Sequence, residues 1–201
     1  GGIPFKPDYI APTNFTLSDL MIGQSKFDDI VNYCDKEMLE AANALPATYE
    51  DPAKYGRITK IMALTVRARM LLFAASPLVN GNPWYKDYRN KSGELIFNPT
   101  YDPQKWVKAA EACKLCIDEA EKAGYKLYKE YNDDGSIDPF MSTYNVHLKR
   151  WSEGNREITF PVTKGNAYKQ IDGLLNWCSV REVGGGNGLG VYQGLVDAFF
   201  T

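Results

Sequence analysis

The sequence predicts a mainly α-helical protein built from tetratricopeptide-like helical hairpins with long loops and a short strand in an irregular region. Three observations carry this prediction. The first two are that apolar residues recur at helical spacing in several segments and that proline or glycine follows most of these segments. A third is that only one short segment alternates in the manner of a strand. The length of 201 residues is enough to bury a core.

The first predicted helix covers about residues 25–45, after an extended segment, 1–24, that contains several prolines. Ser25 can cap it, and Pro46 ends it. Its apolar residues form one face and leave the other face to water. They are Phe27, Ile30, Val31, Cys34, Met38, Ala41 and Leu45.

The second predicted helix begins after a Thr59 cap and stops at Ser76-Pro77, because the residue before a proline disfavours helical angles. It is apolar on two sides, so it should pack against neighbours on two sides. Its alanines allow close approach of those neighbours. Arg67 and Arg69 must then reach water or an acidic side chain from within the packing.

The next two helices are predicted at 102–123 and near 138–150. Asp102-Pro103 is a strong helix start, and Gly124 is a strong stop. The residues Asn132-Asp133-Asp134-Gly135 indicate a turn between the two, which we prefer to an incomplete calcium loop. In the fourth helix we expect Phe140, Tyr144 and Leu148 to face inward. We interpret Trp106 and Trp151, in or beside helices, as packing residues.

Beyond Gly154 the chain changes character. Residues 157–162 predict a short strand, residues 163–190 are irregular and glycine-rich, and a last helix opens near Tyr192. The glycine run at 184–190 lacks the spacing of a dinucleotide-binding loop.

Composition narrows the classes of function. The net charge of −2 does not favour nucleic acid as a partner, and no apolar run is long enough to span a bilayer. Cys113 and Cys116 form a C-x-x-C within a helical apolar pattern; we interpret them as packing residues, with a zinc or redox site as the alternative. His147, the only histidine, has apolar neighbours that favour a structural role. We therefore expect no metal and no cofactor.

The candidate ligand site lies in two loops that mix aromatic with planar polar residues. A carbohydrate receptor needs flat rings for the C–H faces of sugars and polar groups for their hydroxyls. The loop at 77–101 offers Trp84, Tyr85, Tyr88, Asn82 and Arg89, and the later irregular region offers Tyr168, Asn176, Trp177 and Arg181. The alternative is that these tryptophans pin their loops to the domain.

Four stretches resemble SusD/RagB-like outer-membrane nutrient-binding lipoproteins of the Bacteroidetes in the same order. They are "GGIPF" at 1–5, "GRITKIMALTVRARMLLFAASPLVNG" at 56–81, "YDPQKWVKAAEACKLCIDEAE" at 101–121, and "NREITFPV" with "YQGLVDAFF" at 155–162 and 192–200. Gln193-Gly194 stands where the family more often has a polar pair such as Gln-Glu.

The resemblance implies a non-catalytic cell-surface protein that captures oligosaccharide, or in some members peptide, for a SusC-like TonB-dependent transporter. It implies a location on the outer face of the outer membrane, through an N-terminal lipid that none of the four cysteines here can carry. Family chains are more than twice as long, so we expect an internal segment. The resemblance divides it into a tetratricopeptide-like region at 1–154, including the aromatic loop 77–101, and a truncated start of the loop-rich core at 155–201.

Two other functions stay open at this point. A tetratricopeptide-like module would grip a protein or peptide segment on its concave helical surface rather than in the loops. A helical glycoside hydrolase would need two carboxylates across a groove, and no such pair stands out in the sequence.

Overall fold

The computed structural model describes residues 3–8, 10, 13–161, 181, 186, 190 and 193–200. The chain divides into two compact units, Gly1–Pro161 and Val162–Thr201. The fold is mainly α-helical, as the sequence predicts. In the second unit the structure describes one helix, α7 (Gln193–Phe200).

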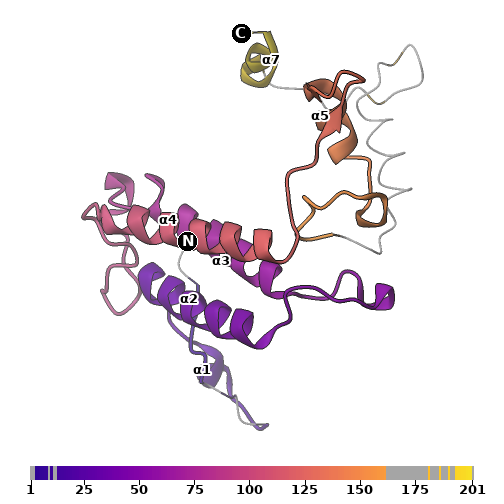
Figure 1. Cartoon of the computed structure of the whole chain (residues 1–201). Coiled ribbons are helices and arrows are strands. Elements are labelled where there is room, and N and C mark those ends of the chain that lie inside the picture. The colour runs from indigo at the N-terminus through magenta and orange to yellow at the C-terminus, as the bar shows by residue number, and fades with distance from the viewer. Residues whose placement is uncertain are drawn as a thin grey trace. The chain divides into compact units, whose positions relative to one another are not determined.

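Three long helices form the body of the first unit: α2 (Phe27–Ala44), α3 (Lys60–Ala75) and α4 (Gln104–Lys122). Consecutive helices run in opposite directions, and α3 packs against both α2 and α4 (Figure 1). The Thr59 side chain caps α3 by accepting from the Met62 N–H, at 3.3 Å. The two-sided packing predicted for the second helix is therefore confirmed.

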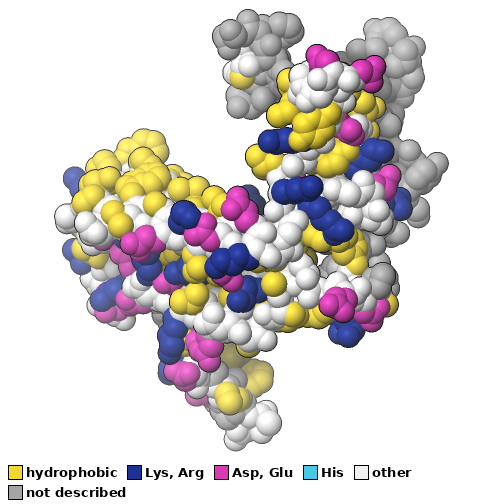
Figure 2. All heavy atoms as spheres, viewed as in Figure 1, with side chains coloured by type: hydrophobic (Ala, Val, Ile, Leu, Met, Phe, Trp, Pro, Cys, Tyr) yellow, Lys and Arg dark blue, Asp and Glu magenta, His cyan; other side chains and the backbone are white. Residues whose placement is uncertain are grey.

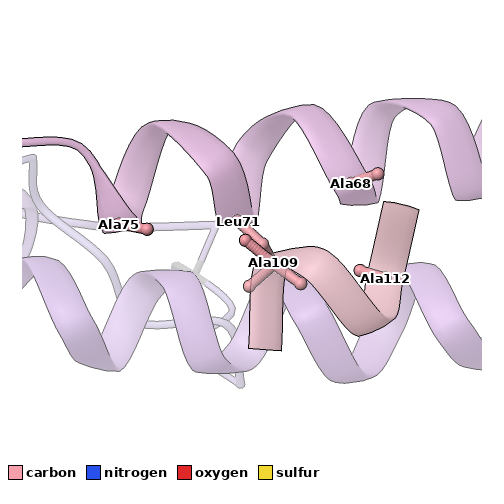
Figure 3. Packing of buried hydrophobic residues seen from close by; sticks show 5 residues of the cluster. All are labelled: Ala68, Leu71, Ala75, Ala109 and Ala112. Carbon is pink, nitrogen blue, oxygen red and sulfur yellow. The ribbon is translucent and has the colours of Figure 1, made fainter. Parts of the chain in front are cut away.

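Small side chains make the α3–α4 contact close. Ala68, Leu71 and Ala75 of α3 meet Ala109 and Ala112 of α4, and all five are buried (Figure 3). Partly buried Cys113 and Cys116 pack against this cluster, and Cys34, Cys113 and Cys116 are free thiols. The part of the chain that the structure describes contains no group of three or more His, Cys, Asp or Glu placed to bind a metal ion.

A charge network ties the three helices together. Asp35 of α2 accepts a 2.7 Å hydrogen bond from Arg67 Nε of α3 and pairs with Lys108 Nζ of α4 at 2.8 Å. The Arg67 and Asp35 side chains are only 10% and 14% exposed, so water screens this pair little. The expectation that Arg67 reaches an acid is confirmed, and Arg69 is exposed to solvent.

The contact between α3 and α4 depends on pH through Glu119 of α4. Hydrogen bonds from Lys122 and Lys60 lower its pKa below the ordinary 4.5. A carboxylate with a lowered pKa stabilises the fold above its unfolded pKa, and this contribution is lost as pH falls through the folded pKa. We expect Glu119→Gln to flatten the fall in melting temperature below pH 4.5, measured from pH 7 to pH 3, with no matching change from Glu111→Gln, an exposed position on the same helix.

Shorter elements complete the described part. Residues 1–24, predicted to be extended, contain the short helix α1 (Leu17–Leu20), because Thr16 and Asp19 form a local capping box. The 3₁₀ turns are η1 (Pro52–Lys54), η2 (Pro83–Tyr85) and η3 (Trp151–Glu153). Strands β1 (Glu130–Tyr131) and β2 (Ile137–Asp138) pair antiparallel around the predicted turn, with Glu130 opposite Asp138. Helix α5 (Pro139–Val146) follows.

Two local predictions were wrong, and a third holds only in part. Residues 157–161 form no strand; Arg156 accepts a single backbone bond from Lys126, and no ladder follows it. Phe140, Tyr144 and Leu148 of the α5 region are exposed, and the first two stack on each other instead of entering a core. Trp106 is 39% exposed, so it is only partly a packing residue, whereas Trp151 packs against Tyr55 and Tyr125.

None of the described helices is both long enough and apolar enough to cross a membrane.

Candidate functional site

The loop 77–101 is a folded unit with its own small core. Val79, Ile96 and Phe97 are buried together, and Phe27 of α2 and Tyr85 pack against them. The backbone of Phe27 also donates to the Ile96 carbonyl at 2.8 Å, which fastens the loop to the start of α2. A long loop that packs its own side chains is typical of a functional surface rather than of a flexible linker.

Asn80 and Gly81 close the neck of this loop. The buried Asn80 side chain donates to the carbonyls of Ala75 and Asp102, and its Oδ1 accepts from the Asp102 N–H at 2.9 Å. Gly81 has φ +72°, and a Cβ there would come within 2.6 Å of the Tyr101 nitrogen. Asn80 is therefore a structural clamp, because both polar atoms of its side chain bond to the backbone.

Trp84 stands at the outer end of the loop. It lies in η2, where the Asn82 side chain caps the turn by accepting from the Trp84 N–H at 2.9 Å and donating to the Leu78 carbonyl at 2.8 Å. The Trp84 side chain is 87% exposed, although its backbone N–H is bonded to Asn82. The structure therefore favours the interpretation of Trp84 as a presented ring over the alternative that it pins the loop.

The two tyrosines of the loop differ in exposure. Tyr85 stacks on the buried Phe97, with ring centroids 4.5 Å apart and planes 22° apart, so one of its faces is occupied. Tyr88 lies 6.2 Å from the same ring and remains 39% exposed. Its hydroxyl accepts a 3.3 Å hydrogen bond from Gln24 Nε2. Phe97 is thus the support for both tyrosines, a role that the sequence did not indicate.

Arg89 stands on a small hairpin. Its backbone forms an antiparallel bridge with Leu95, and its Nη1 donates to the Gly93 carbonyl at 2.7 Å. Asn90 fixes the turn, because its Oδ1 accepts from the N–H groups of Ser92 and Glu94. The Arg89 side chain remains exposed, with donors left for a ligand.

An open groove of about 540 Å³ lies beside this hairpin, between the first turn of α2 and the segment 94–99. Its polar wall consists of Lys26, Asp28, Asp29, Arg89, Glu94 and Asn98, and Phe97 lines its floor. Lys26 pairs with Glu94 at 3.6 Å, and a hydrogen bond from Asn90 lowers the pKa of Glu94, which keeps its carboxylate charged. Sequence reasoning missed Asp29 and Asn98, since nothing in a helix start or a turn marks them for a ligand.

The predicted site residues fall into three groups. Trp84, Tyr85, Tyr88, Asn82 and Arg89 belong to one folded loop, in which Asn82 is a structural cap and Tyr85 is partly used in packing. Arg181 is exposed in the second unit. Tyr168, Asn176 and Trp177 lie outside the described residues.

Hydrophobic side chains also gather on the surface near this loop. Figure 2 shows them over the end of the three-helix body where α3 ends and α4 begins. The exposed apolar residues of these segments include Leu72, Phe73, Leu78, Trp84 and Val107. A patch of this kind marks a contact surface for a ligand or a partner.

Comparison with known proteins gives a structural relative. No protein-family model matches the chain, and no curated protein matches it. The solved structure of BT4246, a Bacteroides thetaiotaomicron protein of unknown function, is similar over 82% of this chain, with 29% sequence identity and a TM-score of 0.69. A second structure, of selenomethionine BT4246, gives 28% identity over 82% of this chain and a TM-score of 0.62. This chain covers 32% and 31% of those chains. The similarity is consistent with a protein of the Bacteroidetes type.

Proposed function

We propose that this chain is part of a non-catalytic glycan-binding protein of the SusD/RagB type, which captures oligosaccharide at the loop 77–101. The observation that carries the proposal is the 87% exposed Trp84 indole, presented by a loop whose backbone is clamped at Asn80 and Asn82. Exposure of so large an apolar ring on an ordered turn is typical of a recognition surface. A fixed ring also loses little conformational entropy on binding.

The surroundings of the loop suit a sugar. Tyr88 adds a second partly exposed ring, and the adjacent groove offers Asp29, Arg89 and Asn98 for hydroxyl groups. Carboxylate, guanidinium and amide groups each accept or donate two hydrogen bonds in one plane, which matches neighbouring hydroxyls. Because the site offers only a small number of stacking and polar contacts, we expect weak binding, which suits a protein that captures a ligand and then releases it.

The similarity to BT4246, together with the sequence stretches that resemble SusD/RagB-like proteins, supports the wider part of the proposal. The full protein would sit on the outer face of the outer membrane through a lipid anchor and pass its ligand to a SusC-like TonB-dependent transporter. It would need no cofactor, metal ion or nucleic acid.

A peptide-binding module is the second candidate, favoured by the exposed apolar residues Val66, Leu72 and Phe73 of α3. These residues lie on a helix rather than in the loop 77–101. Although Leu72 and Phe73 share an exposed apolar patch with Trp84, separate substitutions of Leu72 and Trp84 distinguish the two candidates.

The test is the loss of a single stacking ring. Trp84→Ala should weaken binding of an oligosaccharide ligand about two- to tenfold, since one stacking contact is worth about 0.5–1.5 kcal/mol. Titration calorimetry against a panel of neutral oligosaccharides would identify the ligand and measure the change.

Trp106→Ala is the matched control, because Trp106 is 39% exposed but lies on α4. Equal binding by the wild-type chain and Trp84→Ala would contradict the assignment of the site. A peptide whose affinity falls in Leu72→Ser and not in Trp84→Ala would favour the second candidate.

A further inference from the structure

A second hollow of the first unit is lined by aromatic rings and lies between the α2–α3 connection and the segment 151–161. We name it the aromatic recess; its rings are Tyr49, Tyr55, Tyr125 and Trp151. Trp151 is central: its ring centroid lies 5.0 Å from that of Tyr125 and 6.3 Å from that of Tyr55, and the Arg156 guanidinium lies 4.0 Å from its centre. The free volume of about 40 Å³ would hold roughly three waters, which is room for the edge of one ring.

A larger hollow of about 400 Å³ adjoins the recess, because Tyr125 lines both. We name it the basic hollow. Its wall carries the cations Lys126, Lys129 and Arg156 and the further rings Tyr128 and Tyr131. Both hollows are thus lined by aromatic and positively charged side chains.

The charge of this surface differs from that of the chain. The linings contain five cations, Lys54, Arg57, Lys126, Lys129 and Arg156, against the single acid Glu121. The chain as a whole has a net charge of −2. None of the five cations forms an ion pair within the described part of the chain, whereas the cations of the helical body mostly do. Two acids adjoin the basic hollow through Tyr128, because Glu157 accepts a hydrogen bond from its N–H and Glu130 accepts one from its hydroxyl. The lining of the aromatic recess contains Lys54 and Arg57 and no acid, so the positive charge available to an anionic ligand is mainly that of these two residues.

The polar groups of the recess complete its chemistry. Burial raises the pKa of the Tyr55 and Tyr125 hydroxyls, so both remain neutral at physiological pH. The Tyr49 hydroxyl donates to the Ile58 carbonyl at 3.2 Å, and Thr59 and Thr159 add hydroxyls to the lining. The interior is thus apolar with neutral polar groups, and the charges of Lys54 and Arg57 stand on exposed side chains at its rim.

We infer that the aromatic recess and the basic hollow form a second ligand site, for an acidic oligosaccharide whose rings carry carboxylates. A sugar ring would place its C–H edge among the aromatic side chains, and its carboxylate would meet Lys54 and Arg57. The next acidic ring would extend over the basic hollow toward Lys126 and Arg156. This site lies apart from the residues of the loop 77–101 and does not depend on their function.

The ring geometry favours a sugar over a nucleic acid. A base stacks between parallel aromatic faces. Here the planes of Tyr55 and Tyr125 are inclined to that of Trp151 by 37° and 57°, and Arg156 covers the Trp151 ring. Such inclined rings leave wedge-shaped space, which suits the edge of a puckered sugar ring.

Titration calorimetry of the full 201-residue chain tests this site with four probes: tetragalacturonate, its methyl ester, maltotetraose and a thymidine oligonucleotide. We expect tetragalacturonate to bind about tenfold or more tightly than its neutral ester, with affinity that falls as salt rises. The double variant Lys54→Gln/Arg57→Gln should weaken its binding about tenfold, the sum of two exposed ion pairs. Tyr55→Ala should weaken the acid and the ester alike, because it removes a wall of the recess.

The matched control is Lys36→Gln/Arg69→Gln, which removes the same two kinds of charge from exposed positions on α2 and α3. Thermal melting of each variant checks that the fold is intact. The inference is overturned if tetragalacturonate does not bind, if it binds no better than its ester, or if the control pair weakens it equally. Tighter binding of the oligonucleotide would replace the acidic sugar with single-stranded nucleic acid. Trp84→Ala should leave this binding unchanged, which separates the outcome from that of the proposed function.

Discussion

Asp35→Ala should lower the free energy of unfolding by about 3–5 kcal/mol, because it removes the acceptor of a buried guanidinium. The Arg67 side chain is 10% exposed, and its Nε donates to Asp35 Oδ1 at 2.7 Å. No other acid among the described residues pairs with Arg67, so the variant leaves an uncompensated buried charge. Urea denaturation followed by far-UV circular dichroism measures the loss. A loss of this size would be a large part of the free energy of unfolding of a typical domain.

Two further variants show that the buried charge causes the loss. Lys108→Ala removes a side chain that is 43% exposed, so it should cost less than about 1 kcal/mol. The double variant Asp35→Leu/Arg67→Met removes both buried charges and should recover most of the stability. If Asp35→Ala costs no more than Lys108→Ala, the network does not hold the three helices together as described.

The long helices could be predicted because their signals are local. The apolar period and the Thr59 and Pro46 boundaries placed two helices to within two residues of the observed Phe27–Ala44 and Lys60–Ala75. The expectation that alanines allow neighbouring helices to approach closely is also confirmed, because Ala75 of α3 and Ala109 of α4 are fully buried in the same cluster. A helical repeat of apolar residues shows which face of a helix will be buried, even when the element that covers that face is unknown.

Elements that depend on a distant partner were predicted poorly. The strand expected at 157–162 would have required a partner strand beside it. The described residues 157–161 are not part of a strand. The inward face expected for Phe140 and Tyr144 needed a helix to cover it, and both rings are exposed in the first unit. An amphipathic pattern shows that a face can be buried, but only the tertiary arrangement decides whether it is.

The candidate site shows the same division. The sequence located the aromatic loop, but it could not show which of the aromatic rings are exposed to solvent. Trp84 and Tyr85 belong to the same 3₁₀ turn, yet Trp84 is exposed to solvent and Tyr85 stacks on Phe97. It also turns Asn80 inward, because an amide at that position satisfies three backbone groups at the neck. The stacking of Tyr85 on Phe97 and the bonds between Asn80 and Asp102 join residues far apart in the sequence, and the spacing of residues does not encode such contacts.

Gly81→Ala should open this neck and lower the free energy of unfolding by about 2–5 kcal/mol. Part of the cost is the left-handed backbone, at φ +72°, which penalises any Cβ by about 1–2 kcal/mol. The rest is steric: the new methyl would lie 2.6 Å from the Tyr101 nitrogen and 2.7 Å from its Cα, and these backbone atoms can move only if the loop shifts. Overpacking of this kind adds about 1–3 kcal/mol.

Gly93→Ala separates the two causes, because Gly93 has φ +83° and nothing lies within 4 Å of the Cβ that it would gain. It should therefore show the backbone cost alone, about 1–2 kcal/mol. The excess loss in Gly81→Ala then measures the closed neck, and hydrogen exchange of residues 77–82 should rise more in that variant than in Gly93→Ala. Because Trp84 is presented by the same loop, Gly81→Ala should also weaken oligosaccharide binding, and by more than Gly93→Ala, which can act only through the Arg89 hairpin. Equal stability and equal exchange in the two variants would mean that the neck does not hold the loop, and the clamped presentation of the indole would lose its structural basis.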